Sequence, residues 1–129
     1  MVAYSFKSRF AGPILNGHKG GTIRADRRRH ARPGEELQLY VGMRTKHCRL
    51  ITRKTCIAIE PIRLDFIAER FAIGAHRSLC ESELDVFAKF DGFADFVDMA
   101  EFWKQTHGDP WFCGWHIRWL PLPEGLTDE

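Results

Sequence analysis

The 129-residue sequence lacks several features that would place it in a familiar class of protein. No apolar run approaches the roughly 20 residues that a membrane-spanning helix needs, and no basic segment with a long apolar core opens the chain. We find no internal repeat, no Walker-type phosphate loop, no His-Glu-x-x-His motif and no Ser-His-Asp order. We therefore expect a cytoplasmic protein that makes no use of a membrane.

Cysteine is scarce and poorly spaced for binding a metal. The four cysteines are far apart and form no Cys-x-x-Cys pair: Cys48, Cys56, Cys80 and Cys113. This spacing argues against a zinc knuckle and against a dense disulfide scaffold. His47 and His116 could each supply a further ligand, but we expect reduced cysteines, no metal and no cofactor.

Charge is unevenly distributed along the chain, although the formal net charge is only +2. Residues 1–63 hold 14 Lys and Arg against 4 Asp and Glu, whereas residues 64–129 hold 5 against 13. One interpretation is a basic face that attracts phosphate, opposite an acidic face. The alternative is that the two halves pair with each other across the fold.

Within the basic half, residues 26–34 have no apolar period and end in a Pro-Gly turn signal. Four arginines fall within six positions: Arg27, Arg28, Arg29 and Arg32. Arginine makes bidentate contacts with phosphate and stacks on bases, so we expect an exposed loop that contacts RNA or single-stranded nucleic acid. A loop whose charges are merely solvated is the alternative.

Alternating apolar residues predict short strands through the first half of the chain. The expected strands are 2–6, 37–41, 47–53 and 55–61, with another beginning at 22–24 and a strand favoured in the ambiguous segment 64–75. A short helix at 10–15 should end at Asn16-Gly17, because glycine accepts the left-handed conformation found at helix ends. Short strands in succession favour a barrel or a strongly curved sheet.

Two amphipathic helices are expected in the second half. Residues 83–90 carry apolar side chains at i, i+3 and i+4 after Ser82, a candidate N-cap, and the next helix begins after Asp95 and ends near residue 107. A last strand at 111–120 places three tryptophans on one face, which is more typical of core packing than of a surface for stacking bases. We expect one α+β domain at 1–120, a small mixed β-barrel with flanking helices, and a flexible tail at 121–129.

The most informative stretch is residues 14–24, Ile-Leu-Asn-Gly-His-Lys-Gly-Gly-Thr-Ile-Arg. The Gly20-Gly21 pair permits a tight turn and a close approach of the backbone to a ligand. Strand alternation then puts Thr22 and Arg24 on one face of the strand, where their side chains and that of Lys19 would lie close together. This pattern favours a pocket for an anion or the edge of a base; an ordinary turn with solvated cations is the alternative.

The same stretch resembles the signature of the ASCH family, small members of the PUA-like superfamily. A second piece agrees in order and spacing: Phe90-Asp91-Gly92-Phe93, followed by an amphipathic helix that ends at Phe102-Trp103. The resemblance covers most of the chain. It implies a PUA-like barrel that holds RNA or a single modified base in a cleft between barrel and helices. Gly20, Gly21, Lys19, Arg24 and the arginine loop would then contact the ligand.

The resemblance also implies an enzyme, because some ASCH-like proteins are amidohydrolases that deacylate N4-acylcytidine nucleosides. Their Thr nucleophile, Lys and acidic residue correspond to Thr22, Lys19 and Asp91 here, with Glu81 or Glu83 as other candidates for the acid. The chain has Asp where the family has Glu, which shortens the side chain by one methylene.

Such a triad has a clear physical logic. A lysine whose charge is disfavoured by burial can deprotonate a hydroxyl, and a carboxylate can orient it. Arg24, or the backbone N–H groups of Gly20-Gly21, would stabilise an oxyanion. Ribonuclease activity, which the resemblance implies for some relatives, is the third candidate function. Binding of another protein is a further alternative, but nothing in the sequence selects it.

Overall fold

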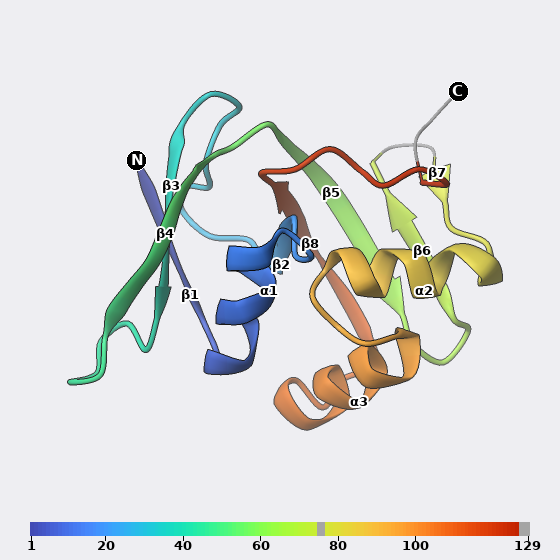
Figure 1. The fold of residues 1–129 in the computed structure, drawn as a ribbon. Coiled ribbons are helices and arrows are strands. Elements are labelled where there is room, and N and C mark those ends of the chain that lie inside the picture. Colours follow the sequence, from blue (N-terminus) through green and yellow to red (C-terminus); the bar gives the residue numbers. More distant parts are fainter. Residues whose placement is uncertain (75–76, 127–129) are drawn as a thin grey trace.

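The structure, a computed structural model, describes residues 1–74 and 77–126 (Figure 1). Its strands are β1 (Val2–Phe6), β2 (Gly21–Arg24), β3 (Glu36–Val41), β4 (Arg49–Thr55), β5 (Ala58–Asp65), β6 (Arg70–Ile73), β7 (Arg77–Ser78) and β8 (Trp111–Arg118). Its helices are a 3-10 turn, η1 (Ser8–Phe10), and the α-helices α1 (Ala11–Asn16), α2 (Glu81–Phe90) and α3 (Phe96–Thr106). Across these ranges, no helix has the length and apolar character needed to cross a membrane.

The strands form two sheets. β1 pairs in parallel with β3, and β3 pairs antiparallel with β4, which gives a mixed three-stranded sheet. The other sheet is antiparallel with the order β2-β8-β5-β6-β7. Helices α2 and α3 cover one face of this five-stranded sheet (Figure 1). The expected α+β class is confirmed, while the strands at 1–74 and 77–126 form two separate sheets and no closed barrel.

Within the ambiguous segment, residues 64–74 contain the end of one strand, a turn and a second strand, and residue 75 lies outside the described part. Strand β5 continues to Asp65, and β6 starts at Arg70. The carboxylate of Asp65 accepts hydrogen bonds from the backbone N–H groups of Ile67 and Ala68, at 3.0 and 2.9 Å. A single strand here is therefore wrong, because the aspartate caps a tight turn within it.

Helix ends follow the expected chemistry with one exception. Gly17 has φ of 86° and ends α1, and the Asp95 carboxylate accepts from the Asp98 N–H at 2.8 Å to begin α3. Ser82 is not the cap of α2, which begins one residue before it. Cys80 occupies the N-cap, and its N–H donates to the Glu83 carboxylate at 2.9 Å. Because the Glu83 carboxylate accepts this hydrogen bond from the Cys80 N–H, the helix starts directly after Cys80.

The last strand does not bury all of its tryptophans. Trp119 is 5% exposed and Trp115 is half-buried, but Trp111 is 61% exposed. The core-packing interpretation is therefore wrong for Trp111, since the helices cover the opposite face of the sheet at this end. Beyond β8, Leu126 is buried, so the expected tail is packed at least to this residue; residues 127–129 lie outside the described part.

His116 is fully buried beneath α2, although it is a titratable residue. Its ring lies 5.2 Å from the Phe87 ring and 6.1 Å from the Phe90 ring, measured between centroids. Neither ring nitrogen has a hydrogen-bond partner among the described residues. Burial lowers the pKa of His116 to about 3, because a charged imidazole loses its hydration there.

This burial predicts a loss of stability in mild acid. The unfolded chain binds a proton at a pKa of about 6.5, whereas the folded chain does so only near 3. The free energy of unfolding should therefore be insensitive to His116 above pH 6.5 and should fall by up to about 1.4 kcal/mol for each pH unit below it. Urea denaturation at pH 7, 6, 5 and 4 should show a shallower decline for His116→Leu. The exposed-site variant His47→Leu should keep the wild-type decline; equal slopes in all three proteins would refute the prediction.

Candidate functional site

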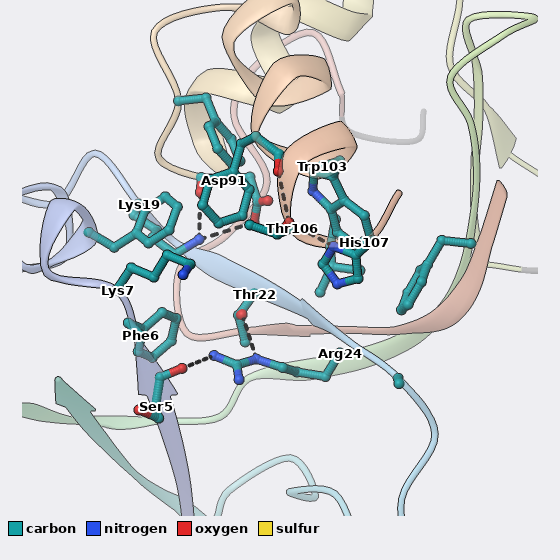
Figure 2. Close-up of a pocket in the computed structure, with 16 residues that line it drawn as sticks. Ser5, Phe6, Lys7, Lys19, Thr22, Arg24, Asp91, Trp103, Thr106 and His107 are labelled. Carbon is teal, nitrogen blue, oxygen red and sulfur yellow. Dashed lines mark hydrogen bonds and ion pairs between the residues drawn. The ribbon is translucent and has the colours of Figure 1, made fainter. Parts of the chain in front are cut away.

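A cavity of about 440 Å³ lies where β1, β2, the end of α2 and the end of α3 meet (Figure 2). Its polar wall contains Lys19, Thr22, Arg24 and Asp91, which the sequence singled out. Aromatic side chains form much of the rest: Phe6, Phe10, Phe93, Phe102, Trp103 and Phe112. Further polar residues, Ser5, Lys7, Thr106 and His107, complete the lining, and the sequence had singled out none of them for this site. The structure therefore brings the four predicted polar side chains to one place.

Lys19 and Asp91 form a buried ion pair in this wall. The side chains are 3% and 5% exposed. The Lys19 Nζ donates to the main-chain oxygen of Asp91 at 2.5 Å and lies 3.3 Å from its Oδ1 (Figure 2). It also lies 4.8 Å from the centroid of the Phe10 ring, within the range of a cation–π contact. Because each charge is desolvated, the pair depends on these contacts.

The chain positions this pair through two helix ends. Lys19 follows the left-handed Gly17, and its N–H donates to the Pro13 oxygen at 2.9 Å. Asp91 is the C-cap residue of α2, and Gly92 follows with φ of 98°. A Cβ on Gly92 would lie 2.9 Å from the Cδ of Lys19, so only glycine lets this loop close over the lysine.

Burial shifts the protonation of both partners toward their neutral forms. It lowers the pKa of Lys19, an effect that the charge and hydrogen bond of Asp91 partly oppose. It raises the pKa of Asp91, which Lys19 opposes in turn. A lysine in its neutral form can accept a proton and a carboxyl group in its neutral form can donate one, so both shifts run toward the forms that exchange protons.

Thr22 and Arg24 lie on one face of β2, as alternation predicts. The Arg24 Nε donates to the Thr22 hydroxyl at 3.0 Å, and its other arm donates to the Ser5 oxygen at 2.6 Å. The guanidinium lies 4.8 Å from the Phe6 ring centroid. Burial lowers the pKa of Arg24 to about 10, so it remains a cation at neutral pH. The hydroxyl of Thr22 is thus held beside a fixed positive charge.

Gly20 and Gly21 have a different role from the one expected. Neither lines the cavity. A Cβ on Gly20 would lie 2.5 Å from the Phe90 ring, and one on Gly21 would lie 2.8 Å from the His116 Nε2. The N–H of Gly20 already donates to the Phe90 oxygen at 2.9 Å. Close packing against α2 and β8 therefore requires glycine at both positions.

The last turn of α3 contributes a wall that the sequence interpretation missed. His107 stacks on Trp103 with ring centroids 4.1 Å apart and an interplanar angle of 17°. Its Nδ1 lies 2.9 Å from the hydroxyl of Thr106, and both residues line the cavity (Figure 2). Burial lowers the pKa of His107. The i, i+4 spacing of Trp103 and His107 on α3 was the available signal.

The arginine loop is exposed, as expected, but none of its four arginines lines the cavity. Arg27 lies over the Tyr4 ring at 4.5 Å and donates to the Arg29 oxygen. Arg29 pairs with Glu35 at 2.5 Å, which lowers the pKa of Glu35 to about 2. Two other side chains, Arg28 and Arg32, have no acidic partner in the part of the chain that the structure describes. These two are the loop's available cations.

Metal binding finds no support in the geometry of residues 1–74 and 77–126. No three His, Cys, Asp or Glu side chains there are grouped as metal ligands would be. The four cysteines are free thiols: Cys48, Cys56, Cys80 and Cys113.

The ion pair predicts a strong coupling between two substitutions. Asp91→Ala should destabilise the protein by about 3–5 kcal/mol at pH 7, because it leaves a buried ammonium without its carboxylate. The double variant Lys19→Met/Asp91→Ala should be less destabilised than Asp91→Ala alone, since it removes the uncompensated charge as well. Urea denaturation of the two single variants and the double variant measures this coupling; simply additive losses would contradict it.

Comparisons of the chain with protein-family models, with curated proteins and with solved structures find no match. The function of the cavity must therefore be inferred from its own geometry. That geometry is a partly open, largely aromatic cavity with a buried lysine, carboxyl group and hydroxyl and a half-buried guanidinium on one side.

Proposed function

We propose that the cavity binds a single modified nucleobase, presented by a free nucleoside or by an unpaired position in RNA. The observation that carries the proposal is the buried Lys19–Asp91 pair, which together with Arg24 forms a polar wall inside an aromatic enclosure. Flat rings fit between aromatic side chains, and their polar edges need fixed donors and acceptors.

The size and polarity of the cavity support this ligand class. Its volume of about 440 Å³ falls within the range of pockets that enclose small molecules. The exposed His107 ring, which stacks on buried Trp103, and the half-buried Phe112 ring line the cavity with their centroids 5.9 Å apart. Lys19, Thr22 and Arg24 offer donors, and Asp91 offers an acceptor or a donor according to its protonation.

The resemblance to ASCH domains supports the same proposal at the level of the fold. A PUA-like domain would hold its ligand between strands and helices, and the cavity lies between β1, β2 and α3. Under this proposal the two sheets correspond to an opened PUA-like barrel. Exposed Arg28 and Arg32 would contact phosphates flanking the bound base.

A second candidate function is deacylation of N4-acylcytidine nucleosides, favoured by the buried lysine near a threonine hydroxyl. Thr22 Oγ1 would attack the acyl carbon and lose its proton to neutral Lys19, while Arg24 stabilises the negative oxygen that develops. Lys19 would return the proton to the departing N4 amine, leaving an acyl-threonine that water hydrolyses. Asp91 would hold Lys19 in place.

Substitution of Thr22 separates the binder from the hydrolase. If the protein hydrolyses N4-acetylcytidine, Thr22→Ala should abolish release of cytidine, with the affinity for the nucleoside changed little. Thr22→Ser, which keeps a hydroxyl, should retain measurable turnover. The rate for the wild type should rise with pH and level off below the ordinary lysine pKa of 10.5, because the reactive form of Lys19 is neutral and its pKa is lowered. Chromatography of the products provides the measurement.

A protein that only binds gives a different pattern. The wild type should then release no cytidine at any protein concentration, and Arg24→Ala should weaken binding of the nucleoside while Thr22→Ala barely changes it. Isothermal titration measures both affinities. No binding and no turnover with any N4-modified or unmodified nucleoside would refute both functions.

The arginine loop provides a separate test of the RNA-bound form. Changing Arg27, Arg28, Arg29 and Arg32 to Ala should weaken binding of a short RNA broadly across sequences. It should also flatten the dependence of log K on log salt by about 0.7 for each lost phosphate contact to a single strand. Since Arg29 pairs with Glu35, the double variant Arg28→Ala/Arg32→Ala should produce most of the change. An unchanged slope in the quadruple variant would show that the loop is only a solvated surface.

A further inference from the structure

A second feature of the molecule lies on the face of the five-stranded sheet that α2 and α3 leave uncovered. Here Trp111, at the start of β8, is 61% exposed. Large aromatic side chains usually bury most of their surface, and an isolated exposed one carries little meaning. Trp111 is not isolated, however, because it lines a hollow of about 470 Å³ together with Arg63, Arg70 and Cys113.

The strand register explains why these side chains share one face. Trp111 is paired with Asp65, which is paired in turn with Arg70, so the three form one row across β8, β5 and β6. Arg63 is paired with Cys113 in the next row on the same face. The alternating positions Leu64 and Phe71 point to the other face and are buried beneath the helices. The register thus places two arginines beside an exposed indole.

Both arginines are available to a ligand. Arg63 and Arg70 are exposed, and neither has an acidic partner within the described ranges. The one carboxylate in the row, Asp65, already accepts hydrogen bonds from the turn that follows β5. Asp65 lines the same hollow, so the face presents two arginines against one carboxylate and is positive on balance.

This face extends along β8 toward the arginine loop. Trp115 is the next but one residue after Cys113 on the same face, and its indole N–H donates to Asp26, where the loop begins, at 3.2 Å. From Trp111 to Trp115 the strand rises about 14 Å, at roughly 3.4 Å per residue. An extended ligand with regularly spaced negative charges would meet positive charge near both ends of this path.

We propose that this face, defined by Arg63, Arg70, Trp111 and Cys113, binds single-stranded nucleic acid. A base stacks on Trp111, and the phosphates beside it contact Arg63 and Arg70. Aromatic stacking combined with cations that follow the backbone is the usual way in which proteins hold single strands without strict sequence preference. None of the four residues lines the cavity, although Phe112 lines both hollows, so the face adjoins the proposed base pocket and uses other side chains.

Charge complementarity favours a nucleic acid over a protein here. A second protein surface would have to supply acidic side chains opposite both arginines and an apolar cover for Trp111. A single strand supplies phosphates and a flat apolar surface in every nucleotide. One ligand class thus satisfies every exposed group of the face.

The test is titration of the full chain with an oligouridylate of eight nucleotides, in the presence of excess N4-acetylcytidine to occupy the cavity. Binding is followed by tryptophan emission and by fluorescence anisotropy of labelled RNA. Stacking should quench the emission of the exposed Trp111, while Trp103 and Trp119 are buried. Trp111→Ala should remove this quenching and weaken binding about ten-fold or more, and Trp111→Phe should retain most of the affinity.

The charged residues are tested by a matched pair of double variants. Arg63→Ala/Arg70→Ala should reduce the salt slope by about 1.4, since each phosphate contact to a single strand contributes about 0.7. Lys46→Ala/Arg49→Ala removes the same charge from the three-stranded sheet and should leave the slope nearly unchanged. Thermal unfolding of all variants confirms that the exposed substitutions preserve the fold.

Three outcomes would overturn the proposal. The first is failure of the wild type to bind the oligonucleotide. The second is binding of the oligonucleotide by Trp111→Ala with the affinity of the wild type. The third is concentration-dependent self-association of the wild type without RNA that Trp111→Ala abolishes, which would make the face a protein interface. Trp111, Arg63 and Arg70 do not line the cavity, so these results test the face whether or not the cavity binds the nucleoside.

Discussion

The site depends on keeping Lys19 and Asp91 together where water does not reach them. Moving each charge out of water costs several kcal/mol, and the cost is offset only if hydrogen bonds and a close partner are held in place. Here the lysine follows the end of α1 and the carboxyl group ends α2, so both helices must stop at fixed points. Gly92 must lack a side chain for the two segments to meet. The path of the backbone around the cavity follows from this one pair.

The uneven charge of the chain has two explanations, each valid for different residues. Lys19 pairs with Asp91 and Arg9 pairs with Asp98, so some cations of the basic half neutralise acids of the other half across the fold. Other arginines are left over. Arg28 and Arg32 are exposed without acidic partners in the described segments, and so they contribute to a basic surface. Pairing and an exposed basic surface therefore coexist.

Local patterns in the sequence predicted those features of the site that depend only on strand alternation and on helix ends. Strand alternation put Thr22 and Arg24 on one face, and Asn16-Gly17 predicted the helix end that turns Lys19 inward. The association of Asp91 with Lys19 came from resemblance to a family, because 72 residues separate the two and no local rule connects them. The close packing of Gly20-Gly21 and the exposure of Trp111 both depend on which face the helices cover. That choice is made by tertiary packing, which periodicity alone does not determine.

The charge state of the cavity also limits what can enter it. Whether the proton resides on Lys19 or on Asp91, the pair sums to no net charge, so Arg24 and the exposed Lys7 are the positive charges that line the cavity. Two nitrogens of that guanidinium already donate hydrogen bonds, one to the Thr22 hydroxyl and one to the Ser5 main-chain oxygen. Such a wall suits the polar edge of an uncharged ring better than a phosphate, which needs several unpaired cations. Phosphates are better matched to the exposed arginines outside. Under the proposed function, a base inside the cavity and a phosphate backbone on the surface would therefore be held by different residues, because none of the loop arginines lines the cavity.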